Sequence, residues 1–71
     1  MPKNVLAAFG TRVREHREKR GWSQEELAHR ADVDVSYLSE IERGKVEPCL
    51  NKMKDLAEAF GISLAEIVRG I

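Results

Sequence analysis

The sequence predicts an all-α fold in which five short helices form a single domain that covers residues 1–71. Apolar residues recur at intervals of three and four, as on one face of a helix, and no segment of useful length alternates apolar and polar residues as a strand does. The hexapeptides GWSQEE and GISLAE, at residues 21–26 and 61–66, each combine a glycine that ends one helix with a serine that begins the next. The expected helices cover about residues 5–20, 23–31, 35–43, 50–60 and 64–69.

Each of the longer expected helices has an apolar stripe that would face a common core. In the first helix this stripe consists of Leu6, Phe9 and Val13, which follow one another at helical spacing. The second and third helices are expected to bury Leu27, Ala28, Ala31, Leu38 and Ile41. The expected stripe of the fourth helix consists of Leu50, Met53, Leu56, Ala57 and Phe60.

A tight turn joins the second and third expected helices. Ser23 and Glu26 are spaced as a capping box, in which the hydroxyl and the carboxylate each bond a backbone N–H group at the helix start. Asp34 is placed to cap the third helix, and Gly44 is placed to end it. Asp32 lies in the turn, where it tolerates a left-handed backbone better than most residues do. Two short helices joined in this way, over about residues 23–43, form a helix-turn-helix, whose second helix can enter the major groove of DNA.

The charge distribution argues against a protein that is held on DNA by bulk positive charge, because the formal net charge is zero. Residues 1–20 nevertheless contain six Lys or Arg and two acidic residues, whereas residues 21–47 contain three Lys or Arg and seven acidic residues. The basic first helix is either a local phosphate-binding face or simply a solvated surface, and the charges alone favour the solvated surface.

Several other classes of function lack the residues that they need. Cys49 is the single cysteine, and with the widely spaced His16 and His29 it does not form a zinc-site pattern. Catalytic groupings and a glycine-rich phosphate loop are also missing from the sequence, so an enzyme, a cofactor and a small-molecule ligand are not expected. There is no apolar run of roughly 20 residues and no signal-peptide pattern, so we expect a cytoplasmic protein without a membrane span.

The segment SQEELAHRADVDVSYLSEIERGK, from Ser23 to Lys45, resembles the helix-turn-helix of the lambda- and 434-repressor-like family of phage repressors. The features that carry the resemblance are Ser23-Gln24, Glu26-Leu27-Ala28, Leu38 with Ile41, Glu42-Arg43-Gly44-Lys45, and downstream Pro48, Leu56-Ala57, Phe60-Gly61-Ile62-Ser63 and Ile67. The likeness covers roughly residues 6–70 and implies a compact five-helix, lambda-repressor-like domain with the motif at helices 2 and 3. The small stand-alone form is similar to controller proteins of restriction–modification systems.

The resemblance implies a DNA-binding surface around the motif. Phosphate contacts are implied for Ser23 and Gln24 at the start of the second helix, and for Arg43 and Lys45 beyond the third. The positions implied to lie at or near the bases are Asp34, Val35, Ser36, Tyr37, Ser39 and Glu40. Asp34 is better explained as a cap, and Glu40 is better explained as a solvated or intramolecular group than as a partner of cytosine.

Readout of the bases is expected to be thin. Val35 can offer a thymine methyl contact but no bidentate hydrogen bond, where many relatives carry Gln or Arg. The shape of the DNA is therefore expected to contribute to recognition. The resemblance also implies a salt bridge between Arg17 and Glu42, which would join the first helix to the end of the third.

The expected function is sequence-specific regulation of transcription by a homodimer on a palindromic double-stranded DNA operator. The C-terminal end is the expected dimer joint, although some of its apolar residues must face the domain's own core: Leu64, Ile67, Val68 and Ile71. One alternative is an antitoxin-type module whose main partner is a protein and whose DNA binding is secondary. The other is a purely structural bundle that does not bind DNA.

Overall fold

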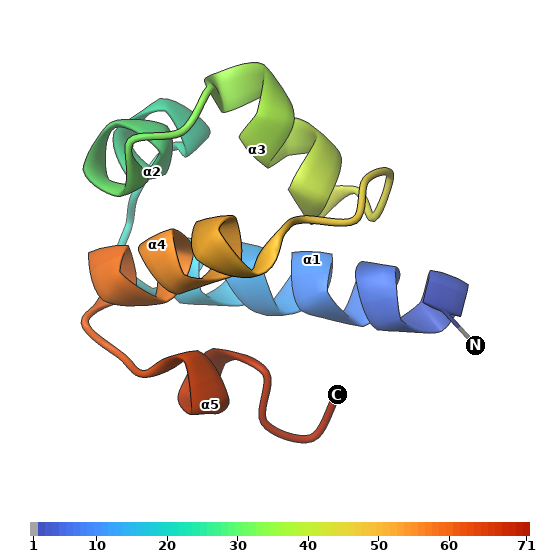
Figure 1. Cartoon of the computed structure of the whole chain (residues 1–71). Coiled ribbons are helices and arrows are strands. Elements are labelled where there is room, and N and C mark those ends of the chain that lie inside the picture. Colours follow the sequence, from blue (N-terminus) through green and yellow to red (C-terminus); the bar gives the residue numbers. More distant parts are fainter. Residues whose placement is uncertain (1) are drawn as a thin grey trace.

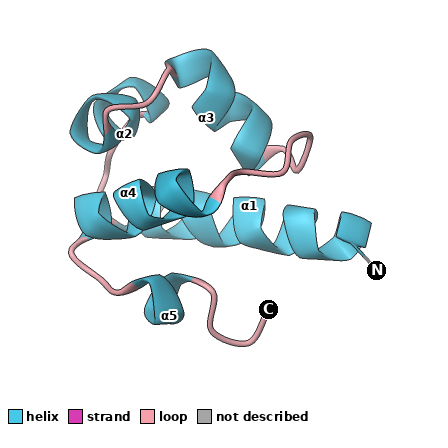
Figure 2. Cartoon of the chain, in the orientation of Figure 1, coloured by secondary structure: helices cyan, strands magenta, loops and turns pink. Residues whose placement is uncertain are grey.

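The computed structural model describes residues 2–71, with side chains from residue 5 onward, and it is all-helical over this range. The helices are α1 (Pro2–Lys19), α2 (Gln24–Ala31), α3 (Val35–Glu42), α4 (Leu50–Phe60) and α5 (Leu64–Ile67). Figure 2 shows helices joined by loops and no strand in the described part, which confirms the predicted fold class. The first helix begins earlier than predicted because proline suits the first helical position, and the last helix ends two residues early.

The helices enclose one core. Figure 1 shows α2 and α3 on one side of the pair formed by α1 and α4, with α5 on the opposite side. In agreement with this view, α1 packs against α3, α4 and α5, and α2 packs against α3 and α4. The buried apolar residues form a single cluster: Phe9, Val13, Leu27, Ala28, Ala31, Leu38, Ile41, Leu56, Ala57, Phe60 and Ile67.

Left-handed residues end the helices and reverse the chain. After α1, Gly21 has a φ of 72°, and the N–H of Trp22 donates to the carbonyl of Arg17 at 3.1 Å. Asp32 closes α2 in the same manner with a φ of 58°, and the N–H of Val33 donates to the carbonyl of Ala28 at 2.9 Å. These bonds satisfy carbonyl groups that a helix end leaves without partners. An aspartate can thus make the tight turn of the motif without glycine, as expected.

Serine hydroxyls begin two of the helices. Ser23 Oγ accepts the N–H of Glu26 at 3.1 Å, and Ser63 Oγ accepts the N–H of Glu66 at 3.0 Å. The reciprocal half of the first capping box is not formed, because the Glu26 carboxylate bonds Arg30 at 2.6 Å instead.

The predicted side-chain cap on α3 is wrong. Asp34 occupies the N-cap position with extended backbone, yet its carboxylate makes no capping hydrogen bond. Because this residue is exposed, water can solvate the carboxylate at little cost.

Leu50 does not belong to the buried stripe of α4, contrary to the sequence prediction. Its exposed fraction is 65%, whereas Leu56, Ala57 and Phe60 are buried. Helical side chains lean toward the N-terminus of their helix. Leu50 is the first residue of α4, so its side chain projects beyond the end of the helix, where the core no longer covers it.

The backbone of α1 lies directly against the C-terminal end of α3 at Gly10. A Cβ atom on Gly10 would lie 2.4 Å from the carbonyl oxygen of Ile41 and 2.7 Å from that of Glu42. One turn earlier in α1, Ala7 lies against Gly44, where a Cβ atom would be 3.0 Å from Ala7 Cα. Main-chain contacts therefore limit how closely α1 and α3 approach each other at this point.

We expect Gly10→Ala to destabilise the domain by about 1–3 kcal/mol or more, because the new methyl group would overlap the α3 carbonyls. At an exposed helical position the same change would instead stabilise by roughly 0.5–1 kcal/mol. Urea unfolding measures the difference. Thr11→Ala, at the exposed neighbouring position, is the control and should be neutral or slightly stabilising. A stabilising effect of Gly10→Ala would contradict the close approach.

His16 is a partly buried titratable group between α1 and α4. Its ring lies 5.2 Å from the Phe60 ring, centroid to centroid, and 3.4 Å separates its Nδ1 from Arg20 Nη1. Burial lowers the pKa of His16 below the ordinary value of about 6.5, and the positive charge of Arg20 lowers it further. Among the remaining neighbours Lys19 and Arg12 also lower this pKa, while Glu66 raises it.

The lowered pKa predicts a loss of stability on mild acidification. The unfolded chain protonates His16 more readily than the folded domain does. The contribution of neutral His16 to the free energy of unfolding is therefore complete above about pH 6.5 and is lost as the pH falls through the folded pKa. The urea midpoint should therefore decrease between about pH 7.5 and 5.5, and His16→Gln should reduce that decrease. His29→Gln, at an exposed position, is the control. An equal pH dependence of the His16→Gln variant and the parent would refute this origin.

Candidate nucleic-acid interface

The helices α2 and α3 form a helix-turn-helix whose inner faces are locked in the core. Leu27, Ala28 and Ala31 of α2 and Leu38 and Ile41 of α3 are all buried. The connecting residues 32–34 form the tight turn closed by the left-handed backbone of the first of them. This packing leaves the opposite side of α3 on the surface of the domain (Figure 1).

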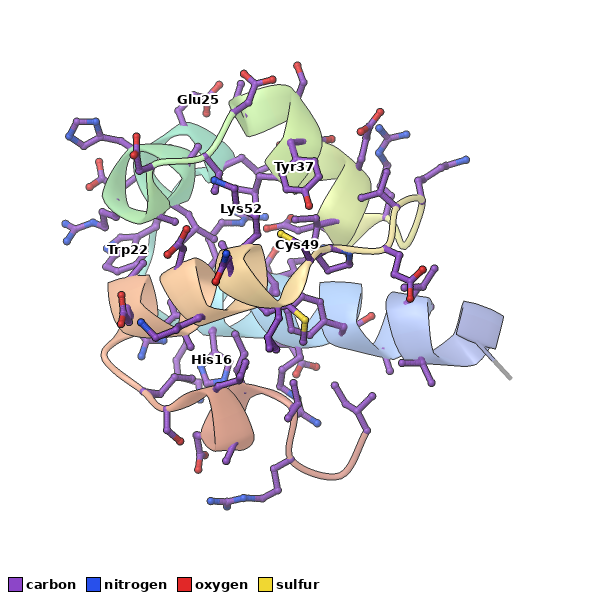
Figure 3. The ribbon with its side chains drawn as sticks, in the orientation of Figure 1. His16, Trp22, Glu25, Tyr37, Cys49 and Lys52 are labelled. Carbon is purple, nitrogen blue, oxygen red and sulfur yellow. The ribbon has the colours of Figure 1, made fainter. Side chains whose placement is uncertain are left out.

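The outer face of α3 presents a small polar surface. Successive helical residues are about 100° apart, so Val35, Ser36, Ser39 and Glu40 share one side. Ser36 and Glu40 are exposed, and Val35 and Ser39 are partly accessible. Tyr37 is not on this side: its ring packs against the core and, in Figure 3, lies on the side of α3 that faces α4.

The residues implied to bind phosphate flank this outer face. Ser23 and Gln24 are at the start of α2, while Arg43 and Lys45 follow α3. Arg43 Nε donates to the carbonyl of Ser39 at 3.3 Å, which holds the stem of the arginine along the last turn of α3. All four side chains are at least partly accessible.

A buried carboxylate at the end of α3 receives a bidentate arginine. The side chain of Glu42 is 1% exposed; Arg17 Nε donates to its Oε2 at 2.7 Å, and Arg17 Nη2 donates to its Oε1 at 3.0 Å. The third nitrogen of the guanidinium, Nη1, donates to the carbonyl of Trp22 at 2.9 Å. The hydrogen bond to Glu42 raises the pKa of Arg17. This is the ion pair that the sequence resemblance implied.

Two further side chains converge on the same carboxylate. Gln24 Nε2 donates to Glu42 Oε1 at 3.0 Å, and Arg14 Nε lies 3.9 Å from that oxygen. Helices α1, α2 and α3 therefore meet at Glu42. The contact also orients the Gln24 amide, which leaves its second N–H and its backbone N–H for any external anion. Sequence reasoning missed the bond between Gln24 and Glu42, because it considered Gln24 only as a phosphate contact.

An aromatic cluster connects the segment before α2 to the end of α4. The ring of Trp22 stacks on Phe60 at 5.9 Å and 14°, and the Arg30 guanidinium lies 4.1 Å from the Trp22 centroid. Arg20 Nη2 donates to the carbonyl of Phe60 at 2.8 Å. Through Trp22 the segment that leads into α2 is thus packed against α4, and Arg30 of α2 covers the same ring.

Of the four apolar residues expected near the C-terminal end, Ile67 is one that faces the domain's own core, where it is fully buried. Its carbonyl accepts a hydrogen bond from Arg12 Nη1 at 3.1 Å, which joins α5 to α1. Leu64 and Val68 are partly buried, and Ile71 is 40% exposed.

Within residues 2–71 no group of three or more His, Cys, Asp or Glu side chains is arranged to hold a metal ion. No helix in this part of the chain is long and apolar enough to cross a membrane.

A family model described as Helix-turn-helix matches residues 13–67, which include α2, α3, α4 and α5. The chain belongs to this helix-turn-helix family. Among its relatives is the HTH-type transcriptional regulator DdrOP3 of Deinococcus deserti, 37% identical over 60 residues that make up 84% of this chain and 46% of the relative. Control protein C.BamHI of Bacillus amyloliquefaciens is 33% identical over 69 residues, 96% of this chain and 85% of that protein.

The fold also matches a solved controller protein. The crystal structure of the restriction–modification controller protein C.AhdI from Aeromonas hydrophila superposes with a TM-score of 0.85 at 40% identity, covering 87% of this chain and 94% of that one. The chain spans less than half of the Deinococcus regulator but most of each controller protein. It therefore carries the DNA-binding domain of a transcriptional regulator, related to restriction–modification controllers, and its relatives are regulators and not enzymes.

We expect Glu42→Ala and Arg17→Ala each to lower the free energy of unfolding by about 3–5 kcal/mol, because each leaves the other charge buried without its partner. The double variant should lose clearly less than the sum of the two, as urea unfolding of all four proteins would measure. Lys54 and Glu58, an exposed pair at 2.7 Å, provide the control cycle and should show little coupling. Additive losses in the Arg17–Glu42 cycle would refute the pair; Glu42→Gln replaces Glu42→Ala if the latter fails to fold.

Proposed function

We propose that this domain binds a palindromic double-stranded DNA operator as a homodimer and places α3 in the major groove. The observation that supports this most strongly is the asymmetry of α3. Its inner face is held by the core, by the Gly10 contact and by Glu42, whereas its outer face is accessible and mostly polar. A rigid helix with an accessible polar face is what insertion into a groove needs.

In this proposal the base-reading set is small. Ser36 and Ser39 bond base edges, and Val35, which is partly packed against the core, contributes at most a methyl contact with thymine. Glu40 lies on the same side of α3 and is compatible only with a base amino group, such as cytosine N4, because base acceptors and phosphates would repel it. Much of the recognition therefore comes from phosphate contacts by Arg43, Lys45 and the start of α2, and from the shape of the DNA.

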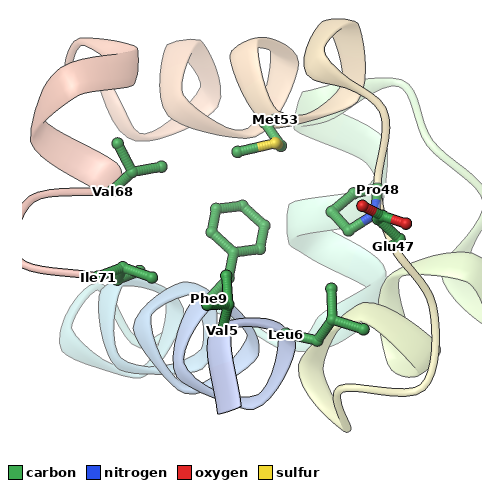
Figure 4. Close-up of a pocket in the computed structure, with 8 residues that line it drawn as sticks. All are labelled: Val5, Leu6, Phe9, Glu47, Pro48, Met53, Val68 and Ile71. Carbon is green, nitrogen blue, oxygen red and sulfur yellow. The ribbon is translucent and has the colours of Figure 1, made fainter. Parts of the chain in front are cut away.

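The second copy is proposed to dock at the C-terminal end. Val68 and Ile71 border an apolar cavity of about 270 Å³ together with Phe9 and Met53 (Figure 4). The exposed Leu50 follows soon after Pro48, which lines the same cavity. A two-fold dimer joined here would present two α3 helices to half-sites about 34 Å apart, or a multiple of that distance.

The same apolar surface is also what a module with a protein partner would carry, and this is the second candidate function. The two candidates differ in what they predict for DNA. A regulator must prefer its operator to random DNA by orders of magnitude, whereas a protein-binding module need not show any preference.

Selection from a random duplex pool at low salt, followed by a salt titration, tests the proposal. We expect a two-fold symmetric sequence to be enriched and its affinity to fall steeply with salt. Arg43→Ala and Lys45→Ala should each flatten the slope of log K against log salt by about 0.9. Lys54→Ala, on α4, is the control and should not change the slope. The proposal fails if no duplex is enriched.

The dimer joint is tested separately with Ile71→Glu. A buried charge at the joint should weaken self-association at least about tenfold, which sedimentation equilibrium measures, and operator affinity should fall with it. Ala8→Glu adds the same charge at an exposed position on α1 and should leave the association unchanged. Wild-type association of the Ile71→Glu variant would place the joint elsewhere.

A further inference from the structure

Arg14 is the solvent-exposed member of the cluster around Glu42. Its side chain is 48% exposed, compared with 13% for Arg17 and 1% for Glu42. On α1 it lies one turn beyond Gly10 and one turn before Arg17, on the side of the helix that meets the end of α3. It therefore stands at the edge of the helix-turn-helix although it is outside the motif.

The carboxylate of Glu42 does not need Arg14. Arg17 binds both of its oxygens, and Gln24 supplies a further donor. At 3.9 Å the contact of Arg14 is an ion pair without a hydrogen bond, and such half-exposed pairs contribute little to stability. The five N–H donors of the Arg14 guanidinium are thus not engaged in hydrogen bonds to Glu42.

Among the charged side chains that contact Glu42, the positive charges outnumber the carboxylate. Two guanidinium groups face one carboxylate, and the Arg17–Glu42 pair is the buried part. The surplus charge is therefore presented by Arg14. Its position is beside Gln24, because both side chains approach the same oxygen of Glu42.

The start of α2 needs such a charge if a phosphate is to bind there. Glu25 and Glu26 lie in the first turn of α2. Glu26 is neutralised by Arg30 at 2.6 Å, but Glu25 is exposed (Figure 3) and would repel a phosphate. A cation next to Gln24 would offset this repulsion.

We infer that Arg14 binds a backbone phosphate of the DNA jointly with the start of α2. The phosphate would lie between the Arg14 guanidinium and the backbone N–H of Gln24, and Glu42 would hold both residues in place without competing strongly for Arg14. This inference rests on the proposed DNA binding of the domain. It adds to the interface a residue of α1 that the helix-turn-helix itself does not contain.

The test compares Arg14→Gln with Lys19→Gln in salt titrations on the selected operator duplex. Both changes remove one positive charge from α1, but Lys19 lies on the side that faces α5, in the cavity lined by His16 and Glu66. Arg14→Gln should flatten the slope of log K against log salt by about 0.9, so that binding is about eightfold weaker at 0.1 M salt if the curves meet at 1 M. Lys19→Gln should leave the slope unchanged, and Arg14→Lys should restore most of it.

The outcomes separate the inference from the function on which it rests. If the parent protein binds no duplex, the proposed function itself fails. If the parent binds and Arg14→Gln has the same slope as Lys19→Gln, DNA binding stands and the role of Arg14 is refuted. A lower melting temperature of Arg14→Gln with an unchanged salt slope would likewise refute it, because Arg14 would then act only on the stability of the Glu42 cluster.

Discussion

The arrangement of the helix-turn-helix depends on one buried carboxylate. A charge as deeply buried as that of Glu42 is costly to fold unless its oxygens are satisfied, and here they accept hydrogen bonds from Arg17 and Gln24. These partners lie on α1 and at the start of α2, while Glu42 ends α3. The cost of burying the charge is therefore compensated only when all three helices are in their native places. A strong electrostatic penalty thus acts against displacement of α3 relative to its supports.

Around this interaction the two faces of α3 differ: one is packed against the domain, and the other is accessible. The inner face of α3 is buried, and the stack of Trp22 on Phe60 packs the residue before the motif against α4. The outer face is accessible, and two of its side chains, Ser36 and Ser39, are short. Such a surface loses little conformational freedom when it meets a groove, because serine has few rotamers to lose. Weak individual contacts on a rigid frame suit the proposed binding mode, in which a dimer repeats them on two half-sites.

Much of this fold was predictable from sequence because helix boundaries are local. Glycine and serine at short spacing determine where the chain leaves and enters a helix, and the structure follows them closely. The errors arose where the burial of a residue depends on helices that are distant in the sequence. The apolar spacing that included Leu50 carries no information on whether the end of a helix extends past the core. The place of Ile67 stayed open because an apolar residue on a short helix suits either the core or a partner. The close approach at Gly10 and the bond from Gln24 to Glu42 connect residues far apart in the sequence. The Arg17–Glu42 pair was foreseen only through family resemblance.

The contact between Gly10 and the α3 carbonyls bears on how such a domain can diversify. Main-chain atoms limit the distance between α1 and the end of α3. Changes of side chain on the outer surface of α3 therefore leave that distance unaltered. If the domain binds an operator through this face as proposed, new combinations of residues at Ser36, Ser39 and Glu40 would alter which operator is preferred and leave the scaffold beneath them unchanged. A single glycine in the first helix would in this way keep the evolution of specificity independent of the evolution of stability.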